Sequence, residues 1–319
     1  MTQQEKRAWI DVGIAALIAT FLLQSRLFAL FFLVPLQSIR VRRGRVAFWY
    51  AAASMIAFVA GLKLVQMTRL GIGFDAAFFF LDLFVPISLC LGLWLIDAPV
   101  LARHKREYRL IAATALGSVG VLPVFGVLAS AEVLTEVVQA QIVMLAGGSE
   151  LVNSGVIDEI VTTAITALYG SFSLGIAVVL GAGWYLGTVL ALRGTERVED
   201  APSLLQFRTE PRLIWAFLVS WAIALIGFYV DIGLLRPVAT NIGLVLALIY
   251  AVQGVGIIRF LMARFGLGRG ARIGIGIAAF FVVLIPGLNL VVVFGVPGLG
   301  LAELWVNFGR TGTNSKESE

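Results

Sequence analysis

The sequence predicts an all-α integral membrane protein, a polytopic bundle of about eight to nine membrane segments. Of its 319 residues, 60% are hydrophobic and 13% are charged, and the mean hydropathy is +0.96. These values lie outside the range of soluble domains. The charges form short clusters that separate long apolar runs. Because a helix needs about 20 apolar residues to cross a bilayer, a chain of this length can supply eight or nine crossings and no soluble catalytic domain.

The apolar runs give the expected helices in chain order. The first run, residues 9–37, is long for one crossing and carries Arg26 near its middle, where a charge costs about 2.5–3.5 kcal/mol. We therefore expect a helical hairpin of residues 9–24 and 27–37 that turns at Ser25 and Arg26, with one long helix as the alternative. Further apolar segments are expected at residues 46–66, 72–96, 109–129, 160–192, 213–229, 237–265 and 273–301.

One membrane domain is expected over residues 1–312, followed by a disordered tail at 313–319. The polar linker 194–212 is the best boundary between two halves, 1–193 and 213–312. Residues 130–159 contain acidic residues and no Lys or Arg, and their apolar residues recur at helical spacing, which favours an amphipathic helix at the membrane interface. In 160–192, small residues recur every four positions and indicate close helix contact: Ala167, Ser171 and Gly175, then Gly183 and Gly187.

The basic residues predict which segments face the cytoplasm. With a cytoplasmic N-terminus and the hairpin, the basic segments 6–7, 40–45, 103–109, 193–212 and 259–272 lie inside. They carry 18 Lys and Arg, against four outside and two uncounted in the tail, as the positive-inside rule requires. Segment 130–159 then lies outside. Arg40, Arg42, Arg43 and Arg45 are interpreted as topology determinants that also contact anionic lipids. The net charge of +5 is spread one loop at a time rather than along one face, so we expect no nucleic-acid partner.

Short motifs over nearly the whole chain resemble one protein family. They are Pro35-Leu36, Arg42-Arg43-Gly44, Phe207-Arg208-Thr209-Glu210-Pro211 with Trp215, Asn241, Tyr250, Gln253-Gly254, and Glu303-Leu304-Trp305 with Arg310. Together they resemble the YybS-like family of bacterial membrane proteins, a domain of unknown function that is distantly similar to the substrate-binding S components of energy-coupling-factor transporters. The resemblance implies a multi-pass protein of the bacterial inner membrane with an S-component-like first half.

The resemblance also implies a docking face on the first helix. S components pack on a coupling subunit through an A-x-x-x-A pattern, and Ala15 and Ala19 have that spacing here, beside Gly13. A separate membrane coupling subunit would then be a partner, together with membrane lipids. Ordinary packing within the bundle is the alternative use of these small residues.

Few residues are suited to catalysis. Metal and nucleophile sites need several His, Cys or carboxylate groups on converging elements, and the chain has one histidine, His104, in a basic loop and one cysteine, Cys90, in an apolar run. We therefore expect no enzyme activity, no metal and no cofactor. The leading hypothesis is a small-molecule-binding or transport-related membrane protein, and the alternative is a non-transporting scaffold or envelope assembly factor.

Asp82 is the strongest candidate for a ligand site, because it is the only acidic residue deep inside an apolar run and such residues usually face the bundle interior. Pro86 leaves the carbonyl of residue 82 without its helical partner. We expect Asp82 to point into the bundle, either on a ligand or proton route or as a hydrogen-bonded link between helices. Asn241, Gln253 and Asn289 are further ligand-binding candidates, with interhelical hydrogen bonding as the alternative for each.

Overall fold

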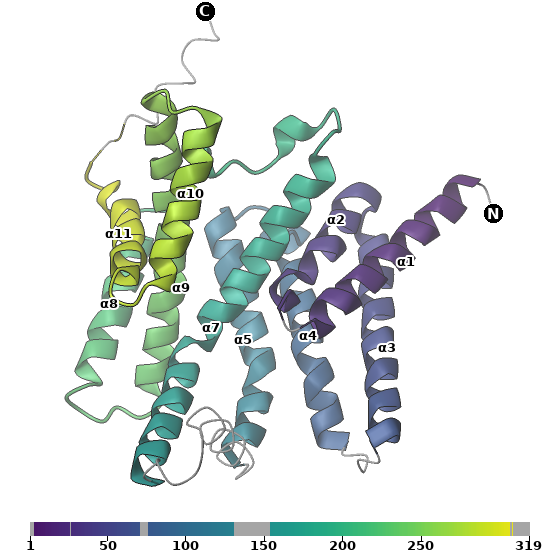
Figure 1. Cartoon of the computed structure of the whole chain (residues 1–319), viewed down its shortest axis with the longest axis horizontal. Coiled ribbons are helices and arrows are strands. Elements are labelled where there is room, and N and C mark those ends of the chain that lie inside the picture. The colour runs from purple at the N-terminus through teal and green to yellow at the C-terminus, as the bar shows by residue number, and fades with distance from the viewer. Residues whose placement is uncertain (1–2, 26, 71–75, 131–153, 307, 309–319) are drawn as a thin grey trace, which may run out of the picture. The chain divides into compact units, whose positions relative to one another are not determined.

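The computed structural model describes residues 3–25, 27–70, 76–130, 154–306 and 308, and all regular elements in these ranges are helices (Figure 1). The chain divides into two compact units, residues 1–201 and 202–319, and the division falls inside the expected linker 194–212. Within the described ranges, four helices are long and apolar enough to cross a membrane: Lys6–Gln24, Arg45–Arg69, Ile165–Leu192 and Leu235–Arg264. Shorter apolar helices cover Asp82–Ile96, Leu213–Ile226 and Asn289–Ala302. The expected eight or nine crossings are therefore only partly accounted for.

The first unit contains the following elements: α1 (Gln3–Gln24), η1 (Ala29–Phe31), α2 (Leu33–Arg43), α3 (Arg45–Leu70), α4 (Ala76–Ile96), η2 (Pro99–Leu101), α5 (Arg106–Ser130), α7 (Ser154–Leu192) and η4 (Val198–Asp200). The second unit contains η5 (Leu204–Gln206), α8 (Leu213–Ile226), α9 (Leu235–Arg264), α10 (Arg269–Leu284) and α11 (Asn289–Ala302). Arg26, Arg310, the tail 313–319 and most of the acidic segment 130–159 lie outside the described residues.

The first apolar run forms two helices, α1 and α2, and α2 turns back along α1 (Figure 1). Ser25 stabilises the end of α1, because its hydroxyl donates to Leu22 O at 2.8 Å and accepts from Phe28 N at 3.1 Å. The second helix differs from the expected 27–37 in that it begins at Leu33 and continues through Arg43. Most of the expected basic loop 40–45 is therefore helical. Gly44, with φ of 91°, ends α2 in a backbone conformation that favours glycine.

The short helix α2 is the centre of the first unit, although its sequence is rich in arginine. It packs against α1, α3, α4 and α7. Its close contact with α7 depends on two glycines of the predicted small-residue stripe. A Cβ at Gly183 would lie 2.6 Å from Leu33 Cβ, and a Cβ at Gly187 would lie 2.6 Å from Gln37 Cβ. The stripe thus allows close packing at these two positions, whereas a Cβ at Gly175 would meet nothing within 4 Å.

In the second unit, α9 packs against α8, α11 and η5. Gly254 on α9 and Gly300 on α11 allow the closest approach, since a Cβ on either would overlap a backbone carbonyl of the other helix. The last apolar run, 273–301, is expected to be interrupted at Pro286-Gly287 and Pro297-Gly298. It forms the helices α10 and α11, which are separated near Pro286-Gly287, whereas Pro297 lies inside α11. Because α9 continues through Arg264 and α10 begins at Arg269, most of the expected basic segment 259–272 is helical.

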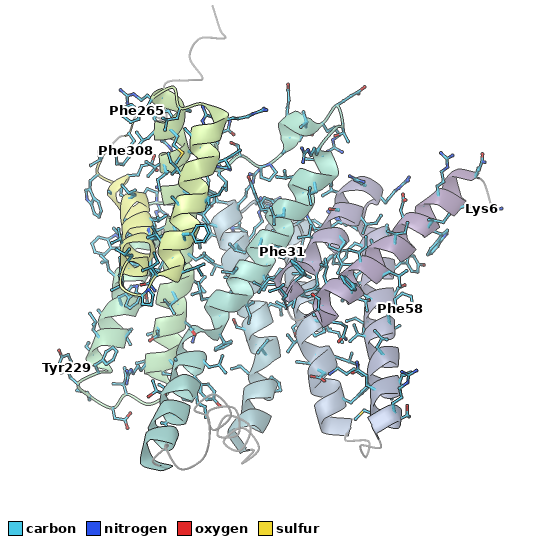
Figure 2. All side chains as sticks on the ribbon, in the orientation of Figure 1. Lys6, Phe31, Phe58, Tyr229, Phe265 and Phe308 are labelled. Atoms are coloured by element: carbon cyan, nitrogen blue, oxygen red, sulfur yellow. The ribbon has the colours of Figure 1, made fainter. Side chains whose placement is uncertain are left out.

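Both units expose large apolar side chains. Those labelled in Figure 2 include Phe58 on α3 and Tyr229 after α8, and further examples are Phe21, Trp215 and Phe294. Large apolar side chains exposed in this number are typical of proteins that contact a membrane or a partner. It agrees with the four helices that are long and apolar enough to cross a bilayer.

Candidate functional site

The helices α2, α4 and α7 all end at the same end of the first unit (Figure 1). The last carbonyl groups of a helix have no partner within the helix, and they attract positive charge. Arginine side chains from neighbouring elements supply these partners at 3.1 to 3.3 Å: Arg40 donates to Leu93 O and Trp94 O, Arg42 to Leu190 O and Ala191 O, and Arg109 to Ile96 O.

The four arginines interpreted as topology determinants therefore have distinct structural positions. Arg40 and Arg42 cap helix ends, and Arg40 is buried. Arg43 forms an ion pair with Asp11 of α1, in which Nε and Nη2 both donate to Asp11 Oδ2, at 3.1 and 2.7 Å. Arg45 is exposed and makes no hydrogen bond or ion pair with any residue in the described ranges. Sequence reasoning gave these residues one shared role, but only Arg45 remains available to bind something else.

Asp97, directly after α4, is the centre of a polar cluster at this end of the unit. Its Oδ1 accepts a hydrogen bond from Trp184 Nε1, and its Oδ2 accepts one from Gln37 Nε2, both at 3.0 Å. Arg40 Nη1 lies 3.9 Å from Oδ2. The Asp97 side chain is nevertheless 31% exposed. The two donors hold the Asp97 carboxylate in one orientation. Because a carboxylate can accept about four hydrogen bonds, its oxygens can still accept further ones.

Gln37 is 1% exposed and connects α2 to α7. Its Nε2 donates to Thr188 Oγ1 at 3.1 Å as well as to Asp97, and Thr188 in turn donates to Trp184 O at 2.7 Å. The carboxylate requires a donor, which fixes the orientation of the amide. Gln37 Oε1 is then a buried acceptor that receives no hydrogen bond from the part of the chain that the structure describes. Such groups are rare in native proteins, and each costs about 1–3 kcal/mol.

Arg40 balances the charge of this cluster. Burial lowers the pKa of the Arg40 guanidinium, the Asp97 carboxylate opposes that shift, and the nearby Arg45 adds to it. An arginine stays protonated in proteins despite such a shift. The Arg40 guanidinium also lies over the Phe48 ring, with its central carbon 5.5 Å from the ring centroid. Arg40 is therefore a fixed charge that partly neutralises Asp97.

These side chains line a pocket of about 400 Å³. Its walls are formed by α2, the junction of α2 and α3, the end of α4, α7 and the segment after α7, all within the first unit. Charged and polar lining residues include Gln37, Arg40, Arg45, Asp97, Trp184 and Thr188. Arg197 and Asp200, also in the lining, pair with each other at 3.2 Å. The pocket thus presents an oriented, partly exposed carboxylate and the unpaired guanidinium of Arg45.

Asp82 does not belong to this pocket. Its side chain is 52% exposed, and its carboxylate forms an ion pair with Lys63 Nζ of α3. The expectation that Asp82 points into the bundle is therefore wrong, whereas the hydrogen bond from Lys63 makes Asp82 a link between α3 and α4, as the alternative interpretation expects. The physical reason is that a cation on the adjacent helix can offset the cost of a carboxylate in an apolar segment, so an inward orientation is not required.

The other three candidates lie in the second unit. Asn241 is buried and donates to Pro237 O, one turn earlier on α9, at 2.8 Å. Asn289 is the first residue of α11 and is half-buried. Gln253 lies on α9, 12 residues after Asn241, which corresponds to about 18 Å along the helix. Within the second unit, Asn241 and Gln253 therefore lie too far apart to form one site.

Gln253 forms the centre of a second polar cluster. Its Oε1 accepts from Thr209 N at 2.8 Å, and its Nε2 donates to Gly300 O at 3.1 Å and to Glu303 Oε2 at 2.8 Å. The Glu303 side chain is 7% exposed, and Arg208 Nη2 lies 3.7 Å from it. Both polar atoms of Gln253 are thus hydrogen-bonded within the second unit, and the residue links the segment before α8 to α9 and the end of α11.

The proposed docking face on α1 is covered in the structure. Ala15 and Ala19 are buried in the core of the first unit, where α1 packs against α2 and α3. Only Gly13 remains open, since a Cβ at that position would meet nothing within 4 Å. The small residues therefore serve packing within the chain, as the alternative interpretation expects.

The sequence does not single out Asp97, because it directly follows the expected apolar segment 72–96, where an acidic residue is common. A usable signal was present on α7, where Trp184 and Thr188 are four residues apart and so lie on the same helix face. No family model, curated protein or solved structure matches this chain. The resemblance to the YybS-like family consequently remains a prediction.

Proposed function

We propose that this chain is a multi-pass membrane protein that binds a small polar molecule in the pocket beside Asp97. The observation that carries the proposal is the state of the Asp97 carboxylate, which three side chains hold in place while 31% of the Asp97 side chain remains exposed. Groups fixed in this way without being fully hydrogen-bonded are typical of ligand sites. A residue with a purely structural role would be expected to have its hydrogen bonds completed by the protein.

The charge distribution supports a side from which the ligand enters. The pocket lining includes residues of the segments 40–45 and 193–212, which the positive-inside rule assigns to the cytoplasm. Arg45, Arg197 and the Asp97 carboxylate all lie in the pocket lining. We therefore propose that the ligand reaches the pocket from the cytoplasm or from the inner leaflet.

A topology experiment tests this placement. In a Cys90→Ala background, cysteines introduced by Ser149→Cys and Thr195→Cys should react with a membrane-impermeant maleimide from opposite sides of the membrane. Cys90 is buried, so its removal serves to eliminate residual labelling. Labelling of both positions from the same side would contradict the proposed topology.

A binding experiment tests the pocket itself. The full chain, purified in mild detergent, should retain a small-molecule adduct that native mass spectrometry detects. The variant Asp97→Asn should lose this adduct, because it replaces the oriented carboxylate with an amide of nearly the same shape. The matched control is Asp82→Asn, the same substitution at an acid outside the pocket, and it should keep the adduct. Equal retention in both variants, or no adduct in the wild-type protein, would argue against binding at Asp97.

The covered Ala15–Ala19 face favours a second candidate function, a scaffold or envelope assembly factor that works without a coupling subunit. Replacement of these alanines by leucine distinguishes the two possibilities. A face that docks a coupling subunit would lose that partner while the fold survives, whereas overpacking of a buried face costs typically 1–3 kcal/mol. We expect the second result, because Ala19 is fully buried. This outcome would leave a self-contained binding protein and a scaffold as the remaining functions, which the adduct experiment separates.

A further inference from the structure

We infer that the pocket binds a compact zwitterion, with a primary ammonium group at Asp97 and a phosphate or carboxylate group at Arg45. This inference rests on the proposed function and specifies its ligand class. It follows from the charges on the pocket wall, from the unfilled hydrogen-bond acceptors, and from the position of the pocket at the ends of apolar helices.

The charges on the wall disfavour a simple anion or a simple cation. Arg197 and Asp200 form an ion pair with each other at 3.2 Å, and Arg40 is committed to the carbonyls of α4. An anion bound at Arg45 would also meet the exposed Asp97 carboxylate, and a cation bound at Asp97 would meet Arg40 and Arg45. A ligand that carries both signs satisfies both sides of the pocket, since charge complementarity selects partners by penalising like charges.

The carboxylate oxygens of Asp97 on the pocket wall can accept hydrogen bonds from N–H donors of a ligand. Asp97 has received one hydrogen bond on each oxygen, from Trp184 and from Gln37, and further lone pairs remain. A primary ammonium group carries three donors that these lone pairs can accept. A quaternary ammonium group has the same charge but no N–H, so it would leave the lone pairs of Asp97 unfilled.

The anionic half of the ligand is assigned to Arg45. Arginine forms bidentate hydrogen bonds with phosphate and carboxylate groups. The side chain is exposed at the start of α3 and pairs with no acid of the described chain. The pocket volume of about 400 Å³ lies in the range of about 300–1,000 Å³ that is typical of small-molecule sites, so both halves of a compact zwitterion can be accommodated.

Two sources could supply this chemistry, the headgroup of an ethanolamine phospholipid and a free zwitterion such as phosphoethanolamine. The test uses the full chain in detergent and compares matched probes. Native mass spectrometry measures the binding of phosphatidylethanolamine, phosphatidylcholine and phosphatidylglycerol, and titration calorimetry measures phosphoethanolamine, phosphocholine and inorganic phosphate. We expect the ethanolamine form to bind roughly tenfold to a hundredfold more tightly than the choline form, the effect of hydrogen bonds to a charged group.

Two variants test recognition of the ammonium group and of the phosphate group separately. Asp97→Asn should abolish the preference for ethanolamine over choline, and Arg45→Gln should weaken both probes equally because both carry the phosphate. Arg45 is exposed, so its variant tests the inference even if Asp97→Asn is poorly folded. Asp82→Asn should change neither affinity. Discrimination seen only with the phospholipids identifies a lipid headgroup site, and discrimination seen only with the free probes identifies a soluble ligand; either result supports the inference.

Other results would overturn it. Equal binding of ethanolamine and choline forms would show that no N–H donor is recognised. Equally tight binding of phosphatidylglycerol or inorganic phosphate would show an anion site, and in that case the pocket still binds a small polar molecule and the proposed function survives. The absence of binding by every probe, while a different adduct co-purifies and depends on Asp97, would reject the ligand class but not the pocket. The absence of any Asp97-dependent binding would reject both.

Discussion

The two units contain polar clusters built from the same three kinds of side chain, and the clusters differ in how completely they are hydrogen-bonded. In each, a buried glutamine donates to a carboxylate that also lies near an arginine: Gln37, Asp97 and Arg40 in the first unit, and Gln253, Glu303 and Arg208 in the second. Around Gln253 both polar atoms are used, and Glu303 is 7% exposed. Around Gln37 the amide oxygen has no partner in the described residues, and Asp97 is 31% exposed.

The comparison teaches how to separate a structural link from a binding site when both consist of buried polar residues. Gln253 was selected from the sequence as a ligand candidate, and its hydrogen bonds are filled by the protein itself. Gln37 was not selected, and it lies in a cluster with spare acceptors beside a pocket. Residue type and burial are the same in the two cases. The number of unfilled hydrogen-bonding positions is what differs, and it determines whether a ligand can be recognised.

The largest expected effect follows from substituting the two glutamines. Gln253→Ala should destabilise the full chain by about 3 kcal/mol, because it removes the hydrogen bond from Gln253 to the buried Glu303 carboxylate and leaves the Thr209 N–H without its acceptor. Gln37→Ala should cost only about 1–2 kcal/mol, since it also removes an unsatisfied acceptor. Equilibrium unfolding of both variants in mixed micelles measures the difference. Equal losses, or a larger loss for Gln37→Ala, would show that the two clusters do not differ as proposed.

A smaller effect is expected from the glycines that permit each cluster to form. Gly187 lies against Gln37, and Gly254 lies next to Gln253 and against Val296 O. Alanine at either position should cost about 2 kcal/mol, within the usual 1–3 kcal/mol of overpacking, with unfolding midpoints as the measurement. The matched control is Gly61→Ala on α3, where a Cβ would meet nothing within 4 Å. There the helix should be stabilised by up to about 1 kcal/mol, and a loss similar to that of the other two would contradict the packing argument.

The sequence predicted the helical class, the break after the first helix and the close contact at Gly183 and Gly187, because each depends on local properties of the chain. Hydropathy, a charge within an apolar run and the spacing of small residues are visible in a single segment. The helix limits were less accurate at basic ends. Arg40 and Arg42 extend α2 beyond the apolar run because they bind the terminal carbonyls of other helices, and this stabilisation cannot be seen in one segment.

The candidate site could not be predicted in the same way, because its residues come from three segments. Gln37, Asp97 and Trp184 are separated by 60 and 87 positions. Each is individually ordinary, and Asp97 in particular directly follows an apolar run, where an acid is common. Only their convergence at one end of the unit creates an oriented carboxylate. In contrast, Asp82 was conspicuous in the sequence because of its apolar neighbours, and Lys63 offsets its charge.

The smallest effect is expected for the Lys63–Asp82 ion pair, in which the Asp82 carboxylate is more exposed than the carboxylates of the two polar clusters. Lys63 lies six residues before the end of the apolar span Arg45–Arg69, about 9 Å along the helix, so its ammonium group can reach the headgroup region. Because both side chains are partly exposed, pairing should contribute about 0.2–1 kcal/mol. A double-mutant cycle of Lys63→Gln and Asp82→Asn measures this coupling in the unfolding free energy. A coupling above about 2 kcal/mol would show that the pair is shielded from solvent and headgroups, and that Asp82 belongs with the buried clusters after all.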